Sequence, residues 1–136
     1  MTHSEKQAQE KELNKLMERL RDSVVLVEGK KDKRALEPYM ESGKILKAAG
    51  RLETACRRAS EIFSACGKST GGEAIVLMDR DSAGKELAVM AKGELEANSI
   101  KADLETRKRL MAILRLTHIE NFGKKYKEKL EELKEN

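Results

Sequence analysis

Two carboxylates with one residue between them, Asp79 and Asp81, come directly after an apolar run at residues 74–78. Carboxylates held this close repel each other unless a cation or a proton lies between them. A site built from carboxylate oxygens suits Mg²⁺ or Mn²⁺ better than Zn²⁺. A third acid, Glu28, follows another apolar run at residues 23–27. These residue types and their spacing suggest a site for a divalent cation.

The elements that must position these acids are two strands. Both apolar runs are rich in β-branched residues, which is typical of buried strands. In a parallel sheet their carboxyl ends lie at the same edge, where open α/β folds bind ligands. If the strands are neighbours, Glu28 lies close to the two aspartates, because adjacent strands are ~4.8 Å apart. A helix is expected after Ser82, from apolar residues at helical spacing: Ala83, Leu87, Met90, Ala91 and Leu95.

Three converging carboxylates would permit phosphoryl chemistry. A cation held between them could polarise a phosphoryl oxygen and lower the pKa of a bound water. Glu28 could alternatively transfer protons, as a general base or acid. A simpler interpretation is that an acid after a strand only caps the next helix, and Asp81 or Ser82 is well placed to do so. The spacing alone leaves these alternatives open.

The rest of the chain alternates strands with helices. Strands are expected at residues 23–27, 43–47, 74–78 and 98–102, and helices at 4–20, 31–37, 52–66, 104–116 and 121–136. The second helix must kink or end before Pro38, and residues 67–72 (GKSTGG) read as a plain loop. This order predicts an α/β fold with about four strands in a mainly parallel sheet sandwiched by helices. We expect an N-terminal helix in residues 1–22, the α/β domain in 23–117 and a C-terminal helical tail in 118–136.

The two terminal segments each carry an apolar stripe. The first half of the N-terminal helix has little apolar surface and is expected to fray, while its second half shares the stripe Leu13, Leu16, Met17 and Leu20. The tail presents Phe122, Tyr126, Leu130 and Leu133 on one side. Such a stripe can pack on the domain or pair with a partner, which makes a homodimer or a protein partner through this helix plausible.

Composition narrows the classes of partner and compartment. A net charge of +4 permits a polyanion such as nucleic acid, while 3% aromatic residues argues against a base-stacking platform. No run approaches the ~20 apolar residues that span a membrane. Cys56 and Cys66 fall on the apolar face of the helix at 52–66 and are expected to be buried free thiols. These features fit a protein of the reducing cytoplasm.

Basic residues accompany the acids. Lys30 and Arg80 are adjacent to them, and Lys31 and Lys85 are close, so these four are candidates for phosphate contacts, with a solvated face as the alternative. Asp103 could be a further acid, although capping of the next helix is the better interpretation. The roles of the basic cluster at residues 107–109 stay open, and no role is assigned to His118.

Two segments resemble the Toprim domain of topoisomerases, bacterial-type primases, old-family nucleases and recombination-repair proteins. They read VEGKKDKRAL at residues 27–36 and VLMDRDSAGKEL at residues 76–87. Glu28-Gly29 matches the Glu-Gly turn of that family, and Asp79-Arg80-Asp81 matches its Asp-x-Asp motif. Within the family, the chain is similar to small stand-alone proteins of archaea and bacteria and to the catalytic domain of ribonuclease M5. It departs at residues 48–50 (AAG), where relatives often carry a hydroxyl residue before the Gly.

The resemblance implies a Rossmann-like fold and a chemistry. Glu28 would act as general base or acid, while Asp79 and Asp81, with Glu28, would hold Mg²⁺ or Mn²⁺. The implied activity is a nuclease or nucleotidyl-transfer reaction on nucleic acid, with RNA processing preferred to DNA chemistry. Strand passage is not expected, because a structural role suits Tyr39 and Tyr126 better than a nucleophilic one. The alternative is a non-catalytic adaptor that binds metal and nucleic acid within a larger assembly.

Overall fold

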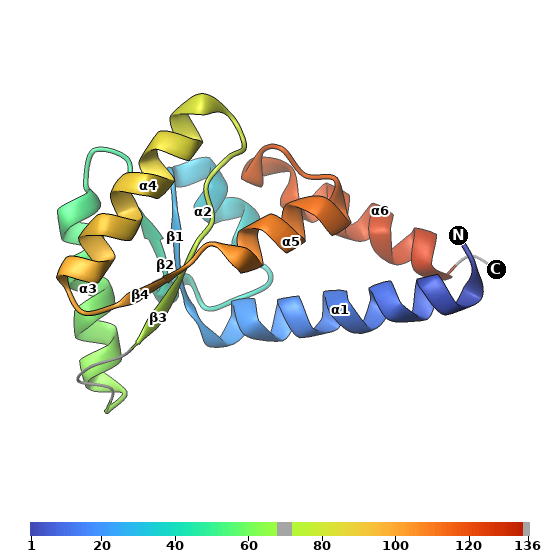
Figure 1. The fold of residues 1–136 in the computed structure, drawn as a ribbon, viewed down its shortest axis with the longest axis horizontal. Coiled ribbons are helices and arrows are strands. Elements are labelled where there is room, and N and C mark those ends of the chain that lie inside the picture. The colour runs from blue at the N-terminus through green and yellow to red at the C-terminus, as the bar shows by residue number, and fades with distance from the viewer. Residues whose placement is uncertain (68–71, 135–136) are drawn as a thin grey trace.

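The computed structural model describes residues 1–67 and 72–134 (Figure 1). Four strands form one sheet in the order β2-β1-β3-β4, and every pairing in it is parallel. Their bounds are Val24–Val27 for β1, Ile45–Lys47 for β2, Glu73–Val76 for β3 and Lys101–Asp103 for β4. The expected α/β class with a parallel sheet is confirmed. The expected loop at 67–72 has its middle, residues 68–71, outside the described residues.

Helices cover both faces of this sheet (Figure 1). One face carries α1 (His3–Asp22), α2 (Lys30–Leu36), α5 (Glu105–Leu114) and α6 (Phe122–Lys134). The other face carries α3 (Leu52–Ala65) and α4 (Ser82–Ala97). Short 3-10 helices lie at Ser42–Lys44 and Ile119–Asn121. Within the described ranges, none of these helices combines the length and hydropathy needed to cross a bilayer.

The strands are buried on both sides, which is why they read as continuous apolar runs. In β1, Val25 and Val27 pack into the core beneath α1, α2, α5 and α6. Val24 and Leu26 point the opposite way, into the core beneath α3 and α4, because successive side chains of a strand alternate between its faces. The fixed register of this central strand places Glu28 at the carboxyl edge.

The N-terminal helix is longer than expected. The expectation of a frayed first half is wrong in this structure, because α1 is continuous from His3. Thr2 caps it, since its hydroxyl oxygen accepts the backbone N–H of Glu5 at 3.1 Å. The second half packs through the expected stripe, all of whose members are buried. The short α2 ends at Leu36, two residues before Pro38, as the proline required.

Two expectations about buried residues were wrong. Met90 of α4 is 61% exposed, because the small residues Gly84, Ala88 and Ala91 turn toward the sheet and rotate Met90 outward. Cys66 is exposed just beyond the end of α3, whereas Cys56 is buried as expected.

The C-terminal helix packs on the domain. Phe122 is fully buried, and Tyr126, Leu130 and Leu133 pack against the same core as β1. The Phe122 ring meets Tyr39 of the segment after α2 edge-on, with ring centroids 5.4 Å apart. The apolar stripe of this helix, which could have packed on the domain or paired with a partner, therefore packs on the domain of its own chain.

Candidate functional site

Glu28 and Asp79 meet at the carboxyl edge of the sheet. Their strands are neighbours, with Leu26 paired to Val76, and the backbone N–H of Leu77 extends the pairing by donating to Leu26 O at 2.8 Å. The Glu28 carboxylate oxygen Oε1 then accepts the backbone N–H of Asp79 at 2.9 Å. The convergence expected from neighbouring parallel strands is therefore present between these two residues.

Asp79 and Asp81 lie together with His118. Each of the three residues offers one potential ligand atom, and these three atoms lie within 4.8 Å of one another. Asp79 is half-buried, whereas Asp81 and His118 are exposed. Each carboxylate offers two oxygens with room for several partners, so both aspartates can bind a cation while keeping a backbone hydrogen bond. Two carboxylates and an imidazole suit Mn²⁺, and the carboxylates also suit Mg²⁺.

Backbone hydrogen bonds fix the orientation of both aspartates. Asp81 is the N-cap of α4, and its Oδ1 accepts the N–H of Gly84 at 2.8 Å. Asp79 Oδ1 accepts the N–H of Ile119 at 2.8 Å. The capping interpretation of Asp81 is thus confirmed, and it does not compete with a metal-binding role because a second oxygen remains.

His118 is the site residue that sequence reasoning missed. It belongs to the connection between α5 and α6. This connection contacts the loop between β3 and α4 (residues 77–81, the acidic loop), where the N–H of Arg80 donates to Thr117 O at 3.0 Å. The Thr117 hydroxyl lies 3.1 Å from His118 Nδ1. No spacing in the sequence signals this approach, because residues 79 and 118 meet only through the tertiary fold.

The first turn of α4 passes very close to the acids. A Cβ atom on Gly84 would lie 2.2 Å from the carbonyl oxygen of Asp79 and 2.7 Å from Glu28 Oε1. No side chain fits at these distances, so only glycine lets the helix begin here. Asp81 needs that helix start, because its capping bond goes to the N–H of Gly84 itself.

Arg107 of α5 holds the backbone of the acidic loop. Its Nε donates to Met78 O at 2.8 Å and its Nη2 to Asp79 O at 2.9 Å. Partial burial lowers the pKa of Arg107 below its ordinary value, and the charge of Arg80 lowers it further, while Asp79 and Glu28 oppose the shift. Its role, open from the sequence, is to position Asp79 from the neighbouring helix.

A cavity of about 410 Å³ opens beside Glu28. It is lined by residues of the Glu-Gly turn and the loops that face it, namely Glu28, Gly29, Lys30, Lys31, Asp32, Ala49, Asp79 and Glu120. Lys30 and Lys31 therefore line the same cavity as Glu28 and Asp79, and their contacts with phosphate stay a prediction. The backbone N–H of Ala49 donates to Glu28 O at 3.0 Å, so the departure at residues 48–50 leaves a backbone contact in place.

Asp32 adds a fourth acid to this cavity. It is 8% exposed and accepts the N–H of Gly29 at 3.2 Å. Burial raises the pKa of Asp32 to about 6, and the negative charges of Asp79, Glu28 and Glu120 raise it too, against the effect of the Gly29 hydrogen bond. The acids near Asp32 therefore add to the effect of burial, and both disfavour its charged form.

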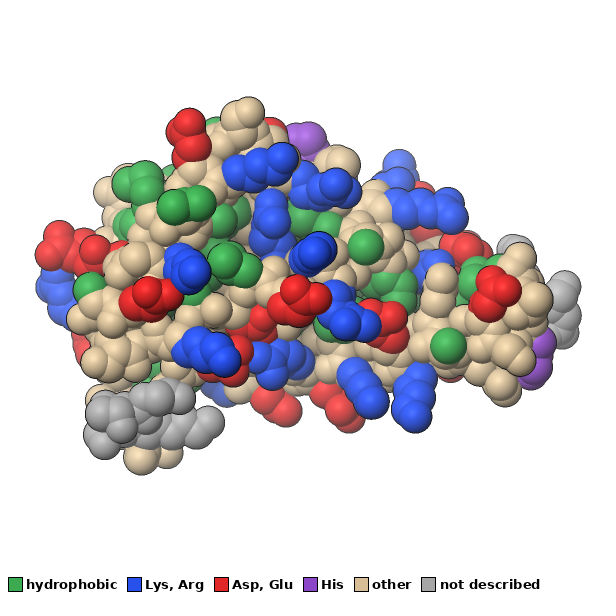
Figure 2. Space-filling view, in the orientation of Figure 1, with side chains coloured by type: hydrophobic (Ala, Val, Ile, Leu, Met, Phe, Trp, Pro, Cys, Tyr) green, Lys and Arg blue, Asp and Glu red, His purple; other side chains and the backbone are tan. Residues whose placement is uncertain are grey.

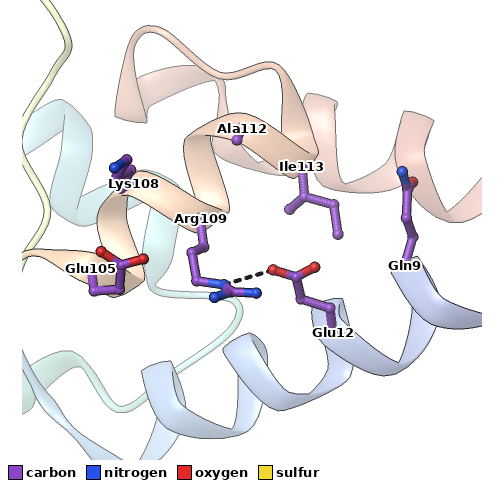
Figure 3. Close-up of a pocket in the computed structure, with 7 residues that line it drawn as sticks. All are labelled: Gln9, Glu12, Glu105, Lys108, Arg109, Ala112 and Ile113. Atoms are coloured by element: carbon purple, nitrogen blue, oxygen red, sulfur yellow. Dashed lines mark hydrogen bonds and ion pairs between the residues drawn. The ribbon is translucent and has the colours of Figure 1, made fainter.

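Asp103 and Arg109 lie outside this site. Asp103 accepts the N–H of Thr106 at 3.0 Å in the first turn of α5 and pairs with Arg19 at 2.7 Å, so the capping interpretation is confirmed. Arg109 pairs with Glu12 of α1 at 2.7 Å. Figure 3 shows this pair in a cavity of about 360 Å³ between α1 and α5, which contains none of the acids predicted for the site.

Comparison with known proteins identifies the fold but not the chemistry. No family model and no curated protein matches the chain. Among solved structures, the chain is similar to a protein from Aquifex aeolicus that is described without a function. The TM-score is 0.58 and the identity is 23%, over 80% of this chain and 96% of that one. Similarity at this identity supports the shared α/β architecture alone.

Proposed function

We propose that this chain is a Toprim-type domain that carries out Mg²⁺- or Mn²⁺-dependent phosphodiester chemistry on nucleic acid, with RNA as the preferred substrate. The observation that carries the proposal is the meeting of acids at one sheet edge. Glu28 lies within hydrogen-bond distance of the Asp79 backbone, and Asp79, Asp81 and His118 present ligand atoms within 4.8 Å. Two free cysteines, one of them exposed, agree with the reducing cytoplasm as the compartment.

Each group has a role in this reaction. Asp79 and Asp81, with Glu28 beside them, would hold the cation, which when bound polarises a phosphoryl oxygen and acidifies a water. Glu28 uses Oε1 for the Asp79 N–H, and its other oxygen remains to accept or return a proton. Lys30, Lys31, Arg80 and Lys85 would bind the phosphates that approach the acids.

The non-catalytic adaptor remains a second candidate because of one specific observation. Glu28, Asp79 and Asp81 each accept a backbone N–H, at 2.9, 2.8 and 2.8 Å. All three acids therefore stabilise loop structure whether or not a reaction takes place. A chain that only binds metal and nucleic acid would need the same residues.

A cleavage assay separates the two candidates. Labelled structured RNA, single-stranded RNA and duplex DNA are incubated with Mg²⁺ or Mn²⁺ and with wild-type, Glu28→Gln, Asp79→Asn or Glu96→Gln protein. Glu96 is exposed on α4, so its variant is a matched control. The proposal expects cleavage of RNA that is lost in chelator and in the first two variants only. Metal binding without cleavage of any substrate would favour the adaptor.

A further inference from the structure

A basic cavity of about 390 Å³ includes Arg80, the residue between Asp79 and Asp81. It is lined by four cations above two apolar side chains, namely Arg80, Lys85, Arg107, Lys108, Met111 and Ala112. The four cations come from the loop after β3, from α4 and from α5. Figure 2 shows Lys and Arg side chains gathered over the region between α4 and α5.

These cations form no ion pair with a carboxylate in the part of the chain that the structure describes. Arg109, the neighbour of Lys108, is by contrast paired to Glu12, and in Figure 3 the Lys108 side chain extends away from that pair. Four unpaired like charges around one cavity repel each other, and an anion between them would relieve that repulsion.

Arg107 connects this cavity to the acids. It lines the cavity together with Arg80. Arg107 already donates Nε and Nη2 to the acidic loop. The cavity is therefore attached to the acids through the same side chain that positions Asp79.

The order of the strands places this cavity in line with the acids. Glu28 and Lys30 follow β1, Asp79 and Arg80 follow β3, and Arg107 lies in the helix after β4, while the sheet order is β1-β3-β4. Cations therefore flank the carboxylates on both sides along one edge. Successive phosphates of a nucleic-acid backbone can contact both groups of cations.

We propose that the cavity formed by Arg80, Lys85, Arg107 and Lys108 is a second phosphate subsite, which binds the backbone phosphate adjacent to the one held at the acids. This inference rests on the proposed function for its substrate class. Lys108 would then contact the substrate directly. The substrate would be a nucleic-acid strand that runs along the carboxyl edge of the sheet from α2 to α5. Met111 and Ala112 add apolar surface to the lining of the cavity.

The test measures binding rather than cleavage, so that its failure differs from failure of the proposed function. Fluorescence anisotropy follows a short oligoribonucleotide that lacks a terminal phosphate, in chelator and again with Mn²⁺, over a range of salt concentrations. Lys108→Ala and Lys85→Ala are compared with Lys92→Ala, a matched control whose side chain is exposed further along α4. Calorimetry of Mn²⁺ binding and circular dichroism check the metal site and the fold of each variant.

We expect Lys108→Ala and Lys85→Ala each to weaken oligonucleotide binding by about 5- to 10-fold and to reduce the salt slope by about one. Mn²⁺ affinity should be unchanged, and Lys92→Ala should behave as wild type. Folded variants that bind as tightly as Lys92→Ala would overturn the subsite. Inorganic phosphate is the second probe. If it binds with dependence on Lys108 while the oligonucleotide does not, the cavity is a free-phosphate site and the backbone assignment is wrong.

Discussion

Gly84 lies where the first turn of α4 meets the acids. The site has no room for a Cβ there, because the nearest atom, Asp79 O, would be 2.2 Å away and belongs to the backbone. We expect Gly84→Ala to lower the free energy of unfolding by about 1–3 kcal/mol. It should also weaken Mn²⁺ binding at least several-fold, since both Asp79 and Glu28 must shift. Urea denaturation and calorimetry measure the two effects.

Gly93 provides the control for this prediction. It lies in the same helix, and a Cβ there would meet nothing within 4 Å. Gly93→Ala should therefore stabilise the protein by up to about 1 kcal/mol through helix propensity and leave Mn²⁺ binding intact. If Gly84→Ala gained stability in the same way, the close approach of α4 to the acids would be contradicted.

Asp32 should make the metal-free protein sensitive to pH. Its pKa is about 6 in the folded chain against an ordinary 3.8, so between these values the folded state holds a proton that the unfolded state has lost. Stability should therefore fall as pH rises through this window. We expect wild type to lose about 1–2 kcal/mol there relative to Asp32→Asn, whose side chain can still accept the Gly29 N–H.

Denaturant unfolding at several pH values, with chelator present, measures this difference. The comparison with Asp32→Asn is essential, because Glu28, Asp79, Glu120 and Lys30 also face the cavity and are the same in both proteins. Parallel stability curves for the two proteins between about pH 4 and pH 7 would show that Asp32 is not held in a negative, buried environment.

At the scale of elements, α5 positions the acidic loop through Arg107. We expect Arg107→Ala to cost about 2–4 kcal/mol of stability, because two hydrogen bonds from a charged donor are lost. Metal affinity should fall too, since Asp79 loses its support. Arg107→Lys should recover only part of the stability and of the metal affinity, because an ammonium group cannot make the bidentate contact of a guanidinium. Arg57→Ala, exposed on α3, is the control. A stability loss with unchanged Mn²⁺ affinity would reduce Arg107 to a purely structural role.

The C-terminal helix belongs to the core on the face opposite α3 and α4. Phe122 is fully buried against that core and contacts Tyr39. Phe122→Ala should therefore lower the free energy of unfolding by about 3–5 kcal/mol, whereas Lys127→Ala, at an exposed position of α6, should change it little. Thermal unfolding compares the two. Equal melting temperatures would mean that α6 is not packed on the domain in solution.

The sequence predicted those elements correctly whose evidence is a short, continuous run of residues. The runs at 23–27 and 74–78 are buried on both faces, so their apolar character alone predicted strands. The apolar pattern of α4 wrongly predicted that Met90 faces the core. Small residues such as Gly84 and Ala88 are buried there instead, and Met90 is exposed. Hydrophobicity favours the larger side chain, while the packing space here favours the smaller one.

At the scale of the whole molecule, the parallel topology accounts for the predicted part of the site. Glu28 and Asp79 are far apart in sequence, and the strand order β1-β3 brings them together, which the rule for parallel strands anticipated. His118 and Arg107 reach the acids from segments after β4. Their positions depend on the packing of α5 and on the loop to α6, which no spacing in the sequence encodes.

The oligomeric state also belongs to this scale. The apolar stripe of α6 packs on its own domain, so a homodimer through this helix would have to use its remaining, mostly charged face. Pairing stays a prediction, and light scattering of the full chain is its direct test.

We propose that Asp79 and Asp81, with Glu28 beside them, bind a divalent cation at the carboxyl edge of the sheet. Calorimetric titration of Mn²⁺ into the full chain tests it most directly, with wild-type, Asp79→Asn and Glu96→Gln proteins compared side by side. We expect one ion per chain for wild type and for Glu96→Gln, and loss of binding in Asp79→Asn, which keeps its acceptor for the Ile119 N–H but not its charge. Absence of Mn²⁺ binding in the folded wild-type protein would contradict the account.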